Sequence, residues 1–190
     1  MERCPWCGTD PMYVKYHDEE WGVPVYDEQK QFEFLVLESM QAGLSWYIVL
    51  KKRENFRMAF AGFDPAEVAR FGEEKVAELL ADQGIIRNKA KILAAINNAA
   101  RFLEIQKEFG SFGNYLWGFV KNKPIKNQFD HLSQIPASTP LSDTISRDLK
   151  KRGFKFLGTT VVYAHLQATG LVNDHLTTCF RWNQLAQCYR

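Results

Sequence analysis

The sequence has no long hydrophobic run. None of its apolar stretches approaches the roughly 20 residues that a membrane-spanning helix needs, and the longest candidates are residues 34–37 and 158–163. The first residues also lack the apolar core of a signal peptide. We therefore expect a cytoplasmic protein with no membrane partner.

Cysteine is scarce, and strand-type alternation is missing. In an intracellular protein, the four cysteines more plausibly are free thiols or metal ligands than disulfides. No segment alternates apolar and polar residues between turn signals, and we find no internal repeat. The 46% hydrophobic and 24% charged residues are the balance of an ordinary globular protein. With no strand pattern and no strong linker, we expect an all-α fold over residues 1–190, either one domain or two small lobes that share a core.

Acidic residues are few in the second part of the chain. Residues 111–190 hold ten lysines and arginines against four acidic residues, within a net charge of +2 for the whole chain. A basic region of this kind is compatible with an anionic partner such as nucleic acid. An ordinary solvated surface gives the same balance, so the charge alone does not decide.

Helical periodicity and end signals predict the elements. Asp64 and Pro65 mark one further helix start, because Asp can cap and Pro suits the first turn. Residues 121–140, with three prolines, predict a connecting loop. The expected helices are 28–42, 44–56, 73–81, 89–108, 142–152 and 160–169.

The helix predicted over residues 28–42 carries an unusual acid. It is apolar on nearly all sides, as a buried helix is, and Glu38 falls between Phe34 and Leu35 on the helical wheel. A buried carboxylate needs donors or a cation, or its pKa rises. The sequence leaves open whether a structural partner or a ligand supplies them.

Residues 73–108 predict a helical hairpin around Gly84. A plain αα-hairpin is one interpretation. The other is a helix-hairpin-helix element, whose turn amides bind a DNA phosphate with added charge from Arg87, Lys89 and Lys91. The basic run at residues 150–155 is a second candidate for DNA contact, although cations at a helix C-terminus also suit the helix dipole.

Possible metal ligands gather at the two ends of the chain. His175 and Cys179 lie one helical turn apart, and Cys4-x2-Cys7 has the spacing of a zinc half-site. Spacing alone chooses these four residues. A second set replaces Cys7 with His17, and unrelated thiols are the alternative to any metal. A thioredoxin-like redox site is disfavoured, because no strand precedes the cysteines.

Several blocks of the sequence together resemble the 3-methyladenine DNA glycosylase type I family. The resemblance spans roughly residues 3–179. The matching blocks include Arg3-Cys4, Trp6, Tyr13-x2-Tyr16-His17-Asp18-x2-Trp21-Gly22-Val23-Pro24, Glu38-x2-Gln41-Ala42-Gly43-Leu44-Ser45-Trp46, Gly84-Ile-Ile-Arg87 and Gly170-Leu-Val-Asn-Asp-His175.

The resemblance implies a helix-hairpin-helix DNA glycosylase. Such an enzyme hydrolyses the N-glycosidic bond of 3-methyladenine in alkylated double-stranded DNA, releases the free base and leaves an abasic site. It also implies one structural zinc ion joining the N- and C-termini, held by Cys4, His17, His175 and Cys179. This set replaces the spacing-based choice of Cys7, although exchange with Cys7 stays open.

The resemblance also implies roles for individual residues. Leu44 enters the DNA stack, and Gly84, Arg87 and Lys89 contact the DNA. Glu38 bonds the edge of the base as the catalytic residue, while Tyr16 and Trp46 sandwich its faces. The residues implied for the base pocket are Tyr16, Glu38, Trp46, Trp6, Tyr13 and Trp21.

Two other functions stay open at this point. A non-catalytic, zinc-stapled helical module that binds DNA would account for the basic turn and the ligands, but not for Glu38 among aromatic residues. A thiol redox protein using Cys4 and Cys7 is the third possibility. Because a cationic leaving base needs no strong acid, we expect a monofunctional hydrolase, and nothing requires more than a monomer. The sequence assigns no role to Cys188.

Overall fold

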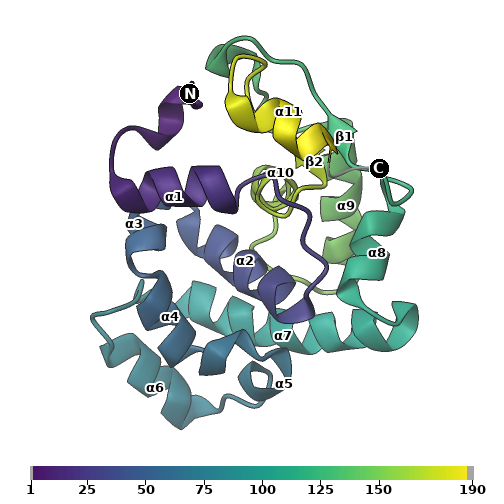
Figure 1. Cartoon of the computed structure of the whole chain (residues 1–190). Helices are drawn as coiled ribbons and strands as arrows, with labels where there is room; N and C mark the ends of the chain where they lie inside the picture. Colours follow the sequence, from purple (N-terminus) through teal and green to yellow (C-terminus); the bar gives the residue numbers. More distant parts are fainter. Residues whose placement is uncertain (1, 188–190) are drawn as a thin grey trace.

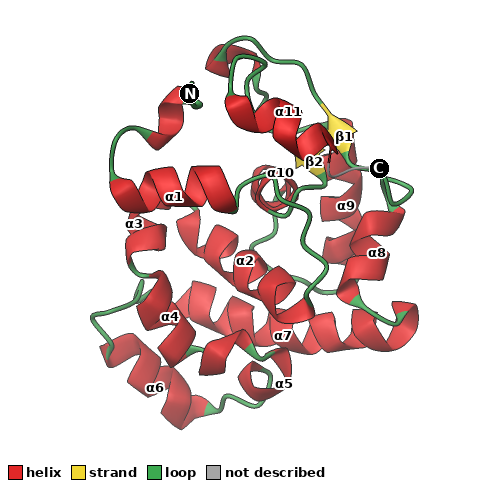
Figure 2. Ribbon diagram, viewed as in Figure 1, coloured by secondary structure: helices red, strands yellow, loops and turns green. Residues whose placement is uncertain are grey.

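The computed structural model describes residues 2–187, and almost all of its regular elements are helices (Figures 1 and 2). Cys188 lies outside the described residues. Within them, no helix has the length and apolar character to cross a membrane. The longer helices are α1 (Pro11–Glu19), α2 (Glu28–Gln41), α6 (Glu73–Ala81), α7 (Lys89–Phe109), α9 (Pro140–Lys151), α10 (Thr159–Ala168) and α11 (Phe180–Gln187).

The remaining elements are short. Within residues 2–187, four α-helices have seven residues or fewer, three segments are 3-10 turns, and two strands have two residues each. They are α3 (Trp46–Lys51), α4 (Arg53–Ala59), α5 (Pro65–Val68), α8 (Phe112–Gly118), η1 (Pro5–Cys7), η2 (Ala61–Phe63), η3 (Leu132–Gln134), β1 (Ile125–Lys126) and β2 (Val172–Asn173).

Helix α2 lies at the centre of the molecule (Figure 1). Asp27 caps its N-terminus by accepting a hydrogen bond from the Lys30 amide at 2.8 Å. It packs against α3, α7, α8 and α10, so residues 31–40 are all buried. Burial of a side chain such as Phe34 contributes about 1.5–3 kcal/mol. The buried helix predicted from its apolar faces is confirmed.

The hairpin of α6 and α7 has nearly the predicted bounds. Asn88 caps α7 by accepting from the Lys91 amide at 3.1 Å. Gly110, with a φ of +83°, ends α7 in the left-handed conformation that glycine adopts readily. The turn between the helices is fixed by Asp82, whose Oδ1 accepts from the Gly84 amide at 2.7 Å.

Two predicted helices need correction, and α1, α8 and α11 were not predicted. The single helix predicted over 44–56 is two helices, α3 and α4, because the backbone at Lys52 turns to a ψ of 0°. Helix α9 begins before Ser142, since Thr139 is its cap and Pro140 its first residue. Helix α1 was not predicted, although Asp10 caps it and Pro11 begins it, which is a recognisable start signal.

A short parallel strand pair brings the C-terminal part of the chain beside the loop after α8. Ile125 pairs with Val172, and a further bridge joins Phe129 to Leu176. The residues that follow β2 run back to the N-terminus, where the Phe180 amide donates to the Glu2 carbonyl at 3.1 Å. This arrangement brings the start of α11 beside the N-terminal residues (Figure 1).

Gly170 allows a close crossing beneath this junction. Its φ is +74°, and a Cβ there would lie 2.5 Å from the Pro24 nitrogen. Two backbone hydrogen bonds join the crossing segments. The Gly22 amide donates to the Gln167 carbonyl and the Val25 amide to the Thr169 carbonyl, both at 3.0 Å. The segment after α1 is thereby fixed against α10.

Candidate functional site

A cavity of about 340 Å³ opens between α1, α2, α3 and α10. Its size is in the range of small-ligand sites in proteins. All six residues that the sequence assigns to a base pocket line it. The lining residues are Trp6, Tyr13, Tyr16, Trp21, Glu38, Gln41, Trp46, Leu132, Ile135, Ala164 and Gln167.

Glu38 is an unpartnered acid in this cavity. Its residue is 4% exposed, and its Oε2 has no hydrogen-bond partner among the described residues. Burial raises the pKa of the carboxyl group to about 8, so the acid is mostly neutral at pH 7. Of the two explanations that the sequence leaves open, the structure favours a ligand.

Two indole groups of the cavity also lack partners. The Nε1 atoms of Trp6 and Trp46 are buried and make no hydrogen bond to a described residue. A buried donor without an acceptor costs about 1–3 kcal/mol, so such groups are rare unless a ligand or water meets them. Together with Glu38, the cavity offers donors and an acid among apolar rings.

The aromatic rings form tilted walls. The ring centroids of Trp6 and Tyr13 are 5.1 Å apart, and those of Tyr16 and Trp46 are 5.4 Å apart at 48°. A flat base between two parallel rings needs about 7 Å between their planes, which is two van der Waals contacts. The sandwich predicted between Tyr16 and Trp46 therefore does not fit. Both rings still line the cavity.

Tyr16 is a donor rather than an anion. Burial, and then the charge of Glu38, raises the pKa of its hydroxyl well above the usual value. Tyr13 lies one turn earlier on α1 and faces the same cavity, as residues three apart on a helix do. The spacing of three residues between Tyr13 and Tyr16 thus places both side chains on the face of α1 that lines the cavity.

The tryptophan walls of the cavity contact two buried histidines on their far side, one of which, His17, follows Tyr16 on α1. The ring of His17 lies 5.2 Å from that of Trp6, and the ring of His175 lies 4.6 Å from that of Trp21. Both contacts are edge-on. The two tryptophans therefore separate the cavity from the histidines and contact both.

Cys4, His17, His175 and Cys179 form a buried group that can hold a metal ion, with one ligand atom of each within 4.8 Å of the others. Three sulfur–nitrogen distances are 3.5 Å: Cys4 to His175, Cys179 to His17 and Cys179 to His175. A tetrahedron with zinc–sulfur bonds of about 2.3 Å and zinc–nitrogen bonds of about 2.0–2.1 Å has such edges of about 3.6 Å. The geometry fits zinc.

The outer nitrogen of each histidine has a hydrogen-bond partner. His17 Nδ1 lies 2.7 Å from Asp18 Oδ1, and His175 Nε2 lies 2.9 Å from the Trp21 carbonyl oxygen. Such partners orient metal-binding imidazoles. Cys7 is outside the cluster, since its thiol donates to the Cys4 carbonyl at 3.2 Å. The spacing-based choice of Cys7 is wrong for this geometry, and the set with His17 is assembled.

The residues expected to contact DNA lie in two places. Leu44 is 39% exposed, and it lines a hollow of about 200 Å³ that shares Glu38 and Gln41 with the cavity. Gly84 and Arg87 are in the hairpin turn and Lys89 begins α7, and all three lie outside the cavity lining. Arg87 and Lys89 are exposed.

Five cavity residues were missed by the sequence reasoning. Gln41 was accessible to it, because it follows Glu38 by three residues on α2 and so shares its face. The other four come from η3, the residue after it, and α10. No local signal identifies them, since only tertiary packing brings them there. They are Leu132, Ile135, Ala164 and Gln167.

Comparison with known proteins gives consistent matches. The methyladenine glycosylase family model matches residues 6–182. DNA-3-methyladenine glycosylase 1 of Escherichia coli (strain K12) is 52% identical over 179 residues, covering 94% of this chain and 96% of that protein.

Solved structures match over the same extent. A crystal structure of 3-methyladenine DNA glycosylase I has a TM-score of 0.92 at 52% identity, and the match covers 94% of this chain and 98% of that one. A single-residue variant of 3-methyladenine DNA glycosylase I, in complex with 3-methyladenine, has a TM-score of 0.91 at 38% identity over 95% and 97% of the chains. The predicted all-helical fold is confirmed.

The two ligand sets can be separated by single substitutions. We expect His17→Ala to lose bound metal and to melt at a lower temperature, because it removes one of four ligands. Cys7→Ser is the matched control and should keep both, since its thiol lies outside the cluster. Metal content by mass spectrometry and melting temperature are measured. Metal loss in Cys7→Ser alone would restore the spacing-based set.

The buried acid should make stability depend on pH. The pKa of Glu38 is about 8 in the folded protein against 4.5 normally, so the folded state holds the proton more tightly. Stability is therefore lost as pH rises from about 5 to 8. Between pH 5 and pH 8, we expect the free energy of unfolding of Glu38→Gln to rise by about 3 kcal/mol relative to that of the wild type. Denaturant unfolding at both pH values checks this, and parallel profiles would contradict it.

Proposed function

The chain belongs to the methyladenine glycosylase family, and on this premise we propose that it excises 3-methyladenine from alkylated DNA. The enzyme hydrolyses the N-glycosidic bond and leaves an abasic site. The observation that carries the proposal is the unpartnered Glu38 carboxyl group in a cavity of aromatic rings.

The cavity suits a flat cation. Methylation at N3 makes the adenine base positively charged while it is still attached to the sugar. Aromatic rings attract such a cation through their faces, and the charge favours ionisation of Glu38 beside it. The free Nε1–H groups of Trp6 and Trp46 are available as further donors. A purine enters only after it is flipped out of the duplex, which costs less where pairing is already weakened.

We propose a monofunctional hydrolysis. Water forms a bond to C1′ of the sugar, the glycosidic bond breaks with its electron pair moving to the cationic base, and the water gives up a proton to solvent. Cleaving the strand as well would use an amine nucleophile, and none of the described residues lining the cavity is a lysine. The product is therefore an abasic site in an intact strand.

We propose that the cluster of two cysteines and two histidines holds one structural Zn²⁺. With four protein ligands, zinc has no open position for chemistry, and its contribution is to folding. His17 and His175 contact Trp6 and Trp21 of the cavity wall. The metal would fix these walls and join the N-terminal residues to the segment after β2.

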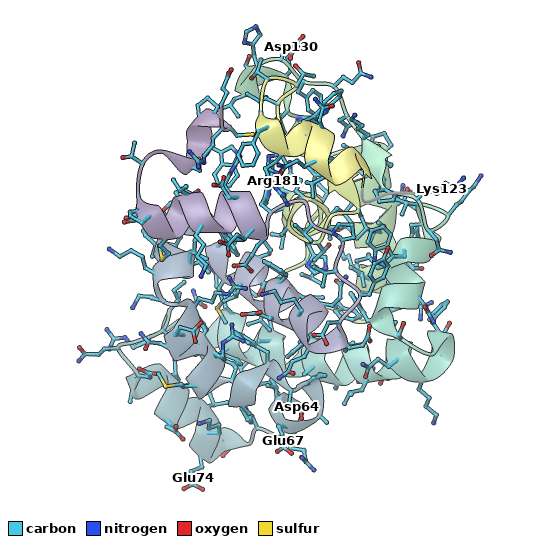
Figure 3. All side chains as sticks on the ribbon, viewed as in Figure 1. Asp64, Glu67, Glu74, Lys123, Asp130 and Arg181 are labelled. Atoms are coloured by element: carbon cyan, nitrogen blue, oxygen red, sulfur yellow. The ribbon has the colours of Figure 1, made fainter. Side chains whose placement is uncertain are left out.

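Two hairpins are candidates for holding the DNA backbone. At the turn of α6 and α7, the Gly84 amide already donates to Asp82, and the Lys91 ammonium group is buried against α2. These two contacts weaken the predicted role of Gly84, although Arg87 and Lys89 stay exposed. The acids Asp64, Glu67 and Glu74, which Figure 3 shows around α5 and the start of α6, lie at the other end of α6 from this turn.

The turn between α9 and α10 is better suited to a phosphate. It borders a groove lined by Arg147, Lys150 and Lys155, which are all exposed, with Asp143 as the opposing charge. Gly158 begins α10 without a side-chain cap, so the first amides of this helix are free of a capping group and can bind an anion. Arg152 is instead paired with Glu108 and Asp148.

Helix α10 also connects this turn to the cavity. Thr160 and Val161 line the hollow beside Leu44, and Ala164 and Gln167 line the cavity itself. A strand held at the start of α10 would therefore pass Leu44, which we propose enters the space left by the flipped nucleotide. Binding is to double-stranded DNA by a monomer.

Base release tests the function directly. We expect the wild type to liberate 3-methyladenine from methylated duplex DNA, identified by mass spectrometry, without strand breaks until alkali is added. Glu38→Gln should excise about 10- to 100-fold more slowly, because it loses a charged hydrogen bond to the base. Glu104→Gln, on an exposed carboxylate of α7, is the matched control. DNA binding without release would favour the non-catalytic DNA-binding module.

Salt dependence identifies the hairpin that contacts the backbone. Each lost phosphate contact lowers the slope of log affinity against log salt by about 1. We expect this change for Lys150→Ala and for Lys155→Ala, and no change for Lys89→Ala, when binding to duplex DNA is measured at several salt concentrations. The opposite pattern would assign the phosphate to the turn of α6 and α7.

A further inference from the structure

The C-terminus of α2 is held in place by another helix. The last carbonyl groups of a helix lack partners within it. Here the chain leaves α2 at Ala42 and turns at Gly43, whose φ is +80°. The Leu44 amide donates to the Gln41 carbonyl, which closes the turn. Two further carbonyls, of Met40 and Ala42, are bound from outside.

Their donor is Lys91, in the first turn of α7. Its Nζ donates to the Met40 carbonyl at 2.9 Å and to the Ala42 carbonyl at 2.6 Å. The residue is only 6% exposed, and this burial lowers the pKa of its ammonium group. The contact corrects the sequence prediction that Lys91 offers its charge to DNA.

A buried lysine here has a specific target. Its positive charge lies at the C-terminus of α2, where the helix dipole favours a cation. The carbonyls that it binds flank Gln41 and lie between Glu38 and Leu44 in the sequence. The same short stretch therefore carries the acid, one cavity wall and the exposed leucine, and Lys91 fixes its backbone.

We propose that Lys91 is a positioning residue for excision from duplex DNA. By binding the Met40 and Ala42 carbonyls, it sets the direction in which the chain leaves α2, and so it places Leu44 at the rim of the cavity. The role rests on the proposed function. It concerns the flipped state in the duplex, and not the affinity of the cavity for a base.

The first test separates these two properties. We expect Lys91→Met to excise 3-methyladenine from duplex DNA about tenfold more slowly in single turnover, since a misplaced positioning group costs about this much or more. Its affinity for free 3-methyladenine, measured by tryptophan fluorescence, should stay within about twofold of the wild type. Lys107→Met, on the exposed last turn of α7, is the control for loss of charge.

The second test links Lys91 to Leu44. In a double-mutant cycle on excision, we expect Lys91→Met to have little further effect in a Leu44→Ala background, because both changes remove the same placement. Additive effects, or an equal loss of free-base affinity, would overturn the role. If Lys91→Met does not fold, Lys91→Gln is measured with the same expectations, because its nitrogen lies one bond nearer the backbone and is not expected to reach both carbonyls.

The outcomes also distinguish the two proposals. If the wild type releases no base from methylated DNA, the proposed function fails. If the wild type and Lys91→Met release it at equal rates, only the role of Lys91 fails. Melting temperatures of all variants are recorded, so that a general loss of stability is not mistaken for a positional effect.

Discussion

An unpartnered carboxyl group on a buried helix is the interaction on which the site depends. Isolating an acid from water disfavours its charged form, and Glu38 has no donor for its Oε2 among the described residues. The apolar packing around α2 offsets the free energy that burial of this carboxyl group costs. Without that packing, the acid would be solvated and would not discriminate between bases.

The fold holds the cavity from two sides. On one side, the buried cluster of two cysteines and two histidines contacts Trp6 and Trp21 through its histidine rings, and it supports these two walls. On the other, α10 contributes Gln167, whose amide donates to Asp174 at 2.8 Å. Because η1 and the residues after β2 come from opposite ends of the chain, neither terminus alone can build this wall.

Strong local signals made part of this predictable from the sequence. The apolar faces of α2 and the glycine that ends α7 act within a few residues, so the bounds of these helices were nearly right. The break at Lys52 depends on how α3 and α4 pack. The choice between Cys7 and His17 depends on the direction of a thiol in η1, and the wall at residues 132–135 depends on a long loop. Spacing describes none of these, whereas the family resemblance selected His17.

In the proposed function, the charge that Glu38 takes up beside the bound base accounts for selectivity. In the empty cavity, an acid with a pKa of about 8 carries little charge at pH 7, and a neutral purine gives it no reason to ionise. A cationic base must displace the proton before it forms the pair, and this displacement lowers its affinity by about tenfold at that pH. The ion pair in an apolar site is stronger than in water, which leaves a net preference for the charged base. Normal adenine forms no ion pair with Glu38, so this stabilisation goes to the methylated base alone.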